Sequence, residues 1–302
     1  MGRFGSVVTA MVTPFDDEGA VDVGCAVEVA RHLVASGSDG LVVAGTTGEG
    51  PVLSDAECLE LFRAVAGAVT VPVVAATGTN DTAHTVALTG AAAECGIDGV
   101  LVVTPYYSRP SRQGISAHFR AAAAATQLPV LLYDIPVRTG RRIGTDLLIE
   151  LAEEVPNIVG VKDATGDVAG AALVVAATPD DFEVYSGDDS LTLPFLSIGG
   201  VGIVSVVSHW AARGLADLVS SFAAGDTAGA TRTNQLLSES YAFASTEQYP
   251  NPVPAKAACR AQGIPVGQCR LPHPPAPDAL VDQARAVIAR LGQRTRTHQS
   301  VA

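Results

Sequence analysis

Eight short apolar runs recur along the first two thirds of the chain, each followed by an amphipathic or alanine-rich stretch. The runs lie at residues 6–12, 40–44, 71–76, 99–103, 130–133, 158–162, 182–185 and 202–206. They are continuous rather than alternating, which is typical of parallel strands buried on both faces. Eight such strand–helix units predict a closed (β/α)8 barrel, the TIM-barrel architecture. A doubly wound open sheet is the alternative, but no GxGxxG motif follows the first run.

The pattern changes after residue 224, where helical stretches follow one another without strands between them. Helices are predicted at 226–243, 253–262 and 277–291, with a proline-rich linker before the last. We therefore divide the chain into a barrel (1–224), a helical extension (225–292) and a polar tail (293–302), which we expect to be disordered. The extension is suited either to capping the barrel or to subunit contacts.

Charge and cysteine usage exclude several classes of partner. The chain of 302 residues carries a formal net charge of −12, which argues against binding to nucleic acid or to an anionic membrane surface. No apolar run reaches the length of a transmembrane helix. The five cysteines are odd in number, far apart and without a CxxC pair, which is typical of reduced cysteines in a cytosolic protein. No cluster of cysteine and histidine predicts a metal site.

Lysine is rare in this chain, and one of its two lysines ends a predicted strand. Lys162 closes the apolar run 158–162, while the other lysine is Lys256. Arginine stays protonated, whereas a lysine amine in an apolar pocket can lose its proton and attack a carbonyl carbon. A solvated lysine beside Asp163 is the simpler interpretation. The rarity of lysine and the apolar run before Lys162 favour a nucleophile.

Other polar residues follow predicted strands, where barrels of this type carry their functional groups. Thr46 and Thr47 lie in a Gly-Thr-Thr-Gly turn, whose hydroxyl and backbone donors suit a carboxylate. Tyr133 ends an apolar run, where a phenol can exchange protons with a neighbour. Arg138 lies in a predicted loop, where a guanidinium can bind a carboxylate through two hydrogen bonds. A simple turn, a core tyrosine and a surface arginine are the corresponding structural interpretations.

Six motifs occur in the order expected of a known family. They are GTTGE (45–49), TPYY (104–107), YDIPVRTG (133–140), GVKDATG (160–166), SGDD (186–189) and GIVSV (202–206). Over residues 3–292 the chain resembles the dihydrodipicolinate synthase family, within the Schiff-base aldolase superfamily that includes N-acetylneuraminate lyase. The Thr46–Thr47 pair, Tyr107 and Arg138 resemble the synthases more than the sugar-acid lyases. The stretch 251–256 also resembles the corresponding segment of the family.

The resemblance implies a lyase of lysine and diaminopimelate biosynthesis that condenses pyruvate with L-aspartate 4-semialdehyde. Lys162 would form an imine with pyruvate, and the charged imine would act as the electron sink, so that no metal and no organic cofactor is needed. Thr46 and Thr47 would hold the pyruvate carboxylate. Arg138 would bind the carboxylate of aspartate semialdehyde.

The resemblance also assigns the other site residues. Tyr133 would move protons, linked through Thr46 to Tyr107, which in the family enters from a neighbouring subunit. The backbone of Ile203 would lie near the pyruvate, and Gly187 is a further substrate-binding position. A homo-oligomer is therefore expected, a tetramer built as a dimer of dimers.

Two alternative functions stay open at this point, and the chain departs from the family at several positions. The alternatives are another pyruvate-dependent aldolase, of the 2-keto-3-deoxy sugar acid or N-acetylneuraminate type, and a non-catalytic ligand-binding barrel. Asp134 stands where the family commonly has asparagine, and Ser208-His209 replaces an asparagine often found after the last strand. His84 replaces the carboxylate that meets the amine of the effector in lysine-inhibited members, so weak or absent inhibition by lysine is expected.

Overall fold

The predicted closed barrel is present. The computed structural model of the chain describes residues 2–244 and 246–299. Eight parallel strands close in sequence order, with β8 paired to both β7 and β1, which excludes the open-sheet alternative. The strands are β1 (Val7–Ala10), β2 (Gly40–Val43), β3 (Val73–Ala76), β4 (Gly99–Val103), β5 (Val130–Asp134), β6 (Ile158–Asp163), β7 (Glu183–Ser186) and β8 (Gly202–Ser205).

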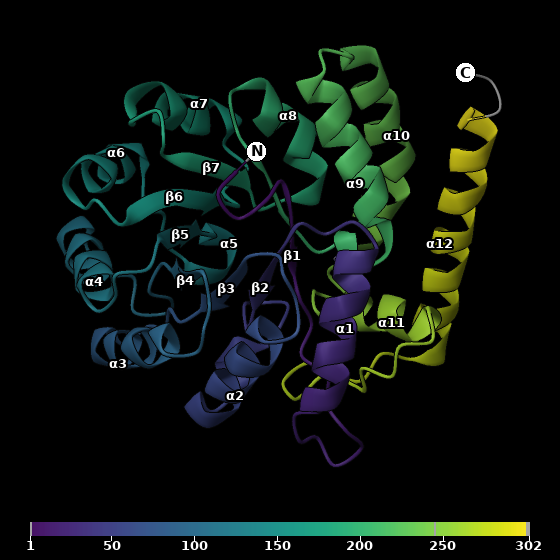
Figure 1. The fold of residues 1–302 in the computed structure, drawn as a ribbon, viewed down its shortest axis with the longest axis horizontal. Coiled ribbons are helices and arrows are strands. Elements are labelled where there is room, and N and C mark those ends of the chain that lie inside the picture. The colour runs from purple at the N-terminus through teal and green to yellow at the C-terminus, as the bar shows by residue number, and fades with distance from the viewer. Residues whose placement is uncertain (1, 245, 300–302) are drawn as a thin grey trace.

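Helices connect the strands and cover the outside of the barrel (Figure 1). They are α1 (Val23–Ala35), α2 (Asp55–Ala66), α3 (Thr82–Ala93), α4 (Arg112–Ala124), α5 (Pro136–Thr139), α6 (Thr145–Glu154), α7 (Val168–Ala177) and α8 (Thr192–Ser197), with the short 3-10 turns η1 (Gly50–Val52) and η2 (Asp189–Leu191). The helix α5, which carries Arg138, lies where the sequence predicted a loop, because a single turn is too short to give a periodic apolar pattern.

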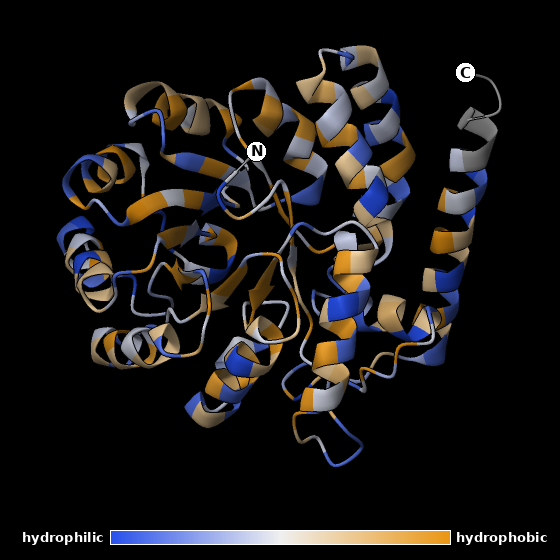
Figure 2. Ribbon diagram, viewed as in Figure 1, coloured by the Kyte–Doolittle hydropathy of each residue, from blue (hydrophilic) through white to orange (hydrophobic). Residues whose placement is uncertain are grey.

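Alternation along the strands separates two apolar layers. Leu131 of β5 faces the barrel interior, whereas Val130 and Leu132 belong to the layer between strands and helices. Successive strand side chains point to opposite faces, so Tyr133 is carried inward at the end of β5. The interior layer also contains Val8, Val42, Val74, Leu101 and Val204. Figure 2 shows hydrophobic residues along the strands and on the inner sides of the helices.

Four further helices stand together on one side of the barrel (Figure 1). They are α9 (Ser208–Ala223), α10 (Thr227–Ala244), α11 (Val253–Ala261) and α12 (Asp278–Gln299). The expected domain boundary at residue 224 falls in the turn between α9 and α10. Leu215, Leu218 and Leu237 form one buried cluster across this turn, so the extension shares a core with the barrel.

The last helix is longer than the sequence predicted. Residues 293–299, where the polar tail was expected to begin, continue α12, and residues 300–302 lie outside the described part of the chain. Polar contacts support this end of the helix: Arg294 lies 3.8 Å from Glu239 of α10, and Thr295 donates to the carbonyl of Leu291 at 2.9 Å. Predictions from apolar periodicity miss a helix end that is held by polar contacts.

Candidate active site

Lys162 and Tyr133 are directly paired on neighbouring strands. The register of β5 against β6 sets Tyr133 opposite Lys162 and Asp134 opposite Asp163. Alternation carries the first pair into the barrel and the second pair outward. Lys162 is 6% exposed and Tyr133 is 4% exposed, and the Nζ atom of Lys162 lies 4.2 Å from the centroid of the phenol ring. The amine is therefore removed from bulk water and in contact with a phenol.

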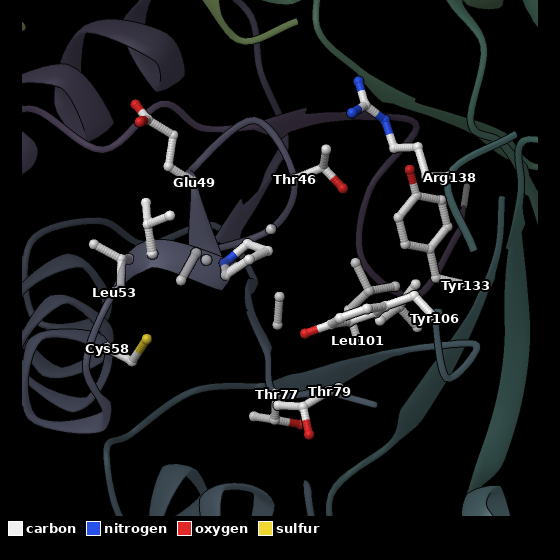
Figure 3. Close-up of a pocket in the computed structure, with 18 of the residues that line it drawn as sticks. Thr46, Glu49, Leu53, Cys58, Thr77, Thr79, Leu101, Tyr106, Tyr133 and Arg138 are labelled. Atoms are coloured by element: carbon white, nitrogen blue, oxygen red, sulfur yellow. The ribbon is translucent and has the colours of Figure 1, made fainter. Parts of the chain in front are cut away.

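A cavity of about 420 Å³ opens at the carboxyl ends of the strands. Its wall includes Thr46, Tyr133 and Arg138 of the predicted site, together with Tyr106. Figure 3 shows the hydroxyl of Thr46 and the phenol of Tyr133 directed into this cavity, with the guanidinium of Arg138 at one end. Lys162 is not part of the wall; it lies against the ring of Tyr133, which is.

The Gly-Thr-Thr-Gly turn depends on close backbone approaches that only glycine allows. A Cβ atom at Gly48 would lie 3.0 Å from the backbone of Ala44, and one at Gly50 would lie 2.1 Å from the carbonyl oxygen of Ala44. The turn buries Thr47, which is 2% exposed, and leaves Thr46 half-buried in the cavity wall. Of the two threonines in this turn, only Thr46 belongs to the cavity wall.

One residue of the helical extension contacts both the threonine turn and Arg138. Asn251, which precedes α11, donates from Nδ2 to Thr47 Oγ1 at 2.9 Å, and its backbone carbonyl oxygen accepts from Arg138 Nη2 at 3.2 Å. Asn251 was not among the predicted site residues. Only the family resemblance of the stretch 251–256 pointed to it, because no local pattern reveals a contact between residues so far apart in the sequence.

Gly187 and Ile203 are not among the residues of the cavity wall. The N–H of Gly187 donates to the carbonyl of Asp163 at 2.6 Å, and a Cβ atom there would lie 2.8 Å from the Cβ atom of Ala164. The side chain of Ile203 packs with Leu215 of α9, on the outside of the barrel. Whatever these two residues offer to a ligand inside the barrel therefore comes from their backbone.

Tyr107 lies on the surface and does not join the cavity of its own chain. It is 91% exposed, and its φ angle of 69° is in the left-handed region that non-glycine residues rarely adopt. The TPYY motif is therefore divided, with Tyr106 in the cavity wall and Tyr107 outside it.

Two buried carboxyl groups follow Tyr133 and Lys162 on the same strands. Asp134 is 2% exposed and Asp163 is 5% exposed. Burial raises the pKa of Asp134 to about 6; the hydrogen bond from the Ile143 N–H, at 3.0 Å, opposes this rise, and the charge of Asp163 adds to it. Burial likewise raises the pKa of Asp163. The sequence marks Asp134 only as a departure from the family and does not predict a buried carboxyl pair.

The second lysine is also buried, in an ion pair with the motif that contains the threonine turn. Lys256 Nζ lies 2.7 Å from Glu49 Oε1, with the two side chains 1% and 0% exposed. The same amine donates to the carbonyl of Gln268 at 2.8 Å and lies 4.0 Å from the centroid of the Phe15 ring. Burial lowers the pKa of Lys256, and the charge of Glu49 opposes this change. Glu49 thus attaches the turn to α11.

The cavity wall also contains a contact between a histidine and a carboxyl group. His84 Nε2 lies 2.8 Å from Asp55 Oδ1, and both residues belong to the wall. The carboxylate of Asp55 is therefore engaged by His84. The expectation that lysine inhibits this protein weakly or not at all stays a prediction.

Several other expectations concern metals, membranes and cysteines. Across residues 2–244 and 246–299, no three side chains of histidine, cysteine, aspartate or glutamate are arranged to hold a metal ion. No helix in that part of the chain has the length and apolar character needed to cross a membrane. All five cysteines are free thiols.

Comparison with known proteins places this site in a family. The model of the dihydrodipicolinate synthetase family matches residues 3–291. The chain belongs to this family. Among curated synthetase relatives, the 4-hydroxy-tetrahydrodipicolinate synthase of Thermosynechococcus vestitus is 46% identical over 296 residues, with 97% of this chain and 99% of the relative covered. The enzyme of the same name from Bacillus subtilis is 45% identical over 275 residues, with 90% and 94% covered.

Solved structures of the synthetase family share the whole fold. The dihydrodipicolinate synthase of Cyanidioschyzon merolae, crystallised with lysine bound, is similar with a TM-score of 0.93 at 43% identity, and 97% of this chain and 99% of that chain are covered. The enzyme of Bacillus anthracis gives a TM-score of 0.91 at 40% identity, with 96% and 99% covered. The barrel with its helical extension is therefore the fold of this synthetase family.

Proposed function

We propose that this chain is a 4-hydroxy-tetrahydrodipicolinate synthase, a lyase of lysine and diaminopimelate biosynthesis that condenses pyruvate with L-aspartate 4-semialdehyde. The observation that carries the proposal is the buried amine of Lys162, 4.2 Å from the centroid of the Tyr133 ring, in a member of the dihydrodipicolinate synthetase family. Relatives at 45% and 46% identity that carry this enzyme name support it.

Lys162 supplies the nucleophile in this proposal. The lone pair of its Nζ atom attacks C2 of pyruvate, and loss of water gives a protonated imine. The imine accepts the electron pair that remains when a methyl proton leaves, which produces an enamine. The enamine carbon then attacks the aldehyde carbon of aspartate semialdehyde. Finally, the amine of that substrate displaces Lys162 from the imine carbon, which closes the ring and frees the enzyme.

Tyr133 transfers the protons that these steps need. Its phenol lies against the Lys162 amine and opens into the cavity that Thr46 also lines. A hydroxyl chain from Tyr133 through Thr46 to a neighbouring subunit's tyrosine, equivalent to Tyr107, connects the site to solvent. The surface position of Tyr107 on its own chain supports this arrangement.

The two substrates are held by their carboxylates. The hydroxyls of Thr46 and Thr47 bind the carboxylate of pyruvate, with the backbone of Ile203 and Gly187 nearby. Arg138, at one end of the cavity, binds the carboxylate of aspartate semialdehyde through its guanidinium (Figure 3).

A homotetramer, organised as a dimer of dimers, completes the proposal. Tyr107 is 91% exposed, and Leu173 is 62% exposed on α7, a helix without a charged residue. A helix that is apolar all round is normally covered by other protein, and Figure 2 shows α7 in hydrophobic colours. Light scattering at micromolar concentration is expected to give the mass of four chains. We place the enzyme in the cytosol, where its five free thiols stay reduced.

A substrate comparison tests the proposed function. Turnover of pyruvate with aspartate semialdehyde, followed by coupling to a reductase that consumes the product, is expected to exceed cleavage of 2-keto-3-deoxy sugar acids or N-acetylneuraminate by a large factor. Faster cleavage of a sugar acid would replace the proposal by the aldolase alternative. Binding of pyruvate without turnover of any of these substrates would favour a ligand-binding barrel.

A further inference from the structure

Asn251 contacts two groups that follow different strands and to which the proposed function assigns substrate carboxylates. Thr47 follows β2 and Arg138 follows β5, and the segment before α11 reaches both of them. Asn251 is 7% exposed, so its hydrogen bonds are made largely out of water. A single residue of the extension is thus in a position to couple the two groups.

The bond between Asn251 and Thr47 has a direction that matters for ligand binding. An amide nitrogen only donates, so Thr47 Oγ1 is the acceptor in the 2.9 Å contact with Asn251 Nδ2. A threonine hydroxyl has a single proton, and this bond does not use it. A carboxylate only accepts, and therefore needs that proton. Asn251 thus leaves the Thr47 hydroxyl in the donor state that binding of a carboxylate requires.

We propose that Asn251 is a positioning residue of the synthase, whose side chain sets the direction of the Thr47 hydroxyl, while its backbone carbonyl holds the guanidinium of Arg138. The proposal rests on the proposed function, since it assigns a carboxylate to each of these groups. One residue of the helical extension then orients the sites of both substrates relative to each other. The extension is in this way part of the active site rather than an appended bundle.

A second attachment keeps Asn251 in place. Lys256 lies one turn into α11, and its buried ion pair holds Glu49, two residues after Thr47. The backbone N–H of Arg270 donates to the other oxygen of Glu49 at 2.8 Å. The threonine turn and the segment 251–256 are therefore joined at two points, and neither can slide past the other without breaking a buried contact. Figure 3 shows Thr46 and Glu49 on one side of the cavity and Arg138 on another.

Substitution by aspartate separates positioning from simple packing. Aspartate has nearly the shape of asparagine, so a packing role predicts that Asn251→Asp is milder than Asn251→Ala. If Asn251 positions the Thr47 hydroxyl, Asn251→Asp should instead raise the KM for pyruvate more than Asn251→Ala does. A carboxylate at this position accepts the Thr47 proton and adds a negative charge beside the substrate carboxylate. We expect Asn251→Ala to raise the KM for pyruvate roughly tenfold, the worth of one hydrogen bond to a charged group. Asn251→Asp is expected to raise it further.

A double variant tests whether Asn251 acts through Thr47. Thr47→Val removes the hydroxyl, so adding Asn251→Ala to it is expected to raise the KM for pyruvate no further, whereas independent effects would multiply. This comparison uses only uncharged substitutions and remains decisive if Asn251→Asp does not fold. Asn157→Ala is the matched control, because Asn157 also donates from Nδ2, in its case to the carbonyl of Ala123 at 2.9 Å, but it directly precedes β6. It is expected to lower the Tm without changing either KM.

The outcomes separate this inference from the proposed function. Suppose that the wild-type chain turns over pyruvate and aspartate semialdehyde, and that Asn251→Ala has the same KM for pyruvate as the wild type. The positioning role of Asn251 is then wrong, but the proposed synthase function is retained. Effects that multiply in the double variant would likewise contradict the positioning role and leave the synthase in place. If the wild-type chain has no such turnover, the proposed function fails and the positioning role fails with it.

Discussion

The amine of Lys162 faces the ring of Tyr133 at 4.2 Å from its centroid, because the two residues are in register on β5 and β6. A shift of either strand by one residue would break this contact, since such a shift turns every side chain of the strand to the other face of the sheet. The apolar runs that specify the barrel register therefore also specify the contact between nucleophile and phenol.

Removing the phenol oxygen is expected to slow the reaction rather than weaken binding. Tyr133→Phe keeps the ring against Lys162 but removes the proton-transfer group, so kcat is expected to fall roughly a hundredfold or more, with a smaller change in the KM for pyruvate. Tyr185→Phe is the control, because Tyr185 is a buried barrel tyrosine whose hydroxyl donates to Glu183 at 2.9 Å. Steady-state kinetics of both variants check this; equal losses in kcat would contradict a special function of Tyr133.

Mixing two inactive variants tests whether Tyr107 acts across a subunit contact. An oligomer built only of Lys162→Arg chains, or only of Tyr107→Phe chains, is impaired at every active site. In a mixed dimer, one site combines an intact Lys162 with an intact Tyr107 from the other chain. Random exchange is then expected to restore about a quarter of the wild-type activity. Activity assays after dissociation and reassociation measure this, and no recovery despite proven exchange would show that Tyr107 acts within its own chain or not at all.

Asp134 is expected to make the folded protein less stable as the pH rises. Burial raises its pKa from 3.8 to about 6, so between these values the folded state binds more protons than the unfolded state, and the free energy of unfolding falls with rising pH. Since each pKa unit corresponds to about 1.4 kcal/mol, ionising Asp134 costs the folded state roughly 3 kcal/mol above pH 6.

The variant Asp134→Asn removes this cost. It is expected to raise the Tm at about pH 8 and to change it little at about pH 4. The exposed Asp146→Asn, on α6, serves as the control and is expected to show no such difference. Thermal unfolding of the three proteins at both pH values checks the prediction. If Asp134→Asn is less stable than the wild type at pH 8, the prediction for Asp134 is contradicted.

The Glu49–Lys256 pair is expected to behave as a buried ion pair. Lys256→Met leaves an uncompensated carboxylate in the interior and is expected to destabilise the fold by about 3–5 kcal/mol. Adding Glu49→Gln should recover part of that loss, because no buried charge is left unpaired. The half-exposed pair of Arg112 and Glu150, 2.7 Å apart, is the comparison: Arg112→Met is expected to cost about 1 kcal/mol or less. Denaturant unfolding at one protein concentration measures the free energy of unfolding of Lys256→Met, the double variant and Arg112→Met. If the losses from Lys256→Met and Glu49→Gln simply add, the two side chains are not coupled as a buried ion pair.

Local patterns predicted the barrel because each strand carries its own signal. The apolar run at 158–162 corresponds to β6, Ile158–Asp163, and it placed Lys162 at the end of a strand. The motifs after the strands predicted that Thr46, Tyr133 and Arg138 meet. All three line one cavity, because the parallel strands of a barrel end at the same rim.

The contacts of the helical extension were not predictable in this way. Asn251 meets Thr47 from 204 positions away, and the Glu49–Lys256 pair joins the same two segments. A lone asparagine or a second lysine has no periodic pattern to mark it, so such long-range polar contacts appear only in the folded chain. No local pattern indicates either that Asp134 and Asp163 are buried next to each other.

Borohydride reduction in the presence of pyruvate tests the central claim most directly, because the chain has only two lysines to compare. Lys256 is held in its buried ion pair, which makes it an internal control. The account predicts one reduced pyruvate group per chain, found by peptide mass spectrometry on Lys162, absent without pyruvate and absent from Lys162→Arg. An unmodified Lys162 under conditions of turnover, or an adduct on Lys256 alone, would contradict the Schiff-base mechanism.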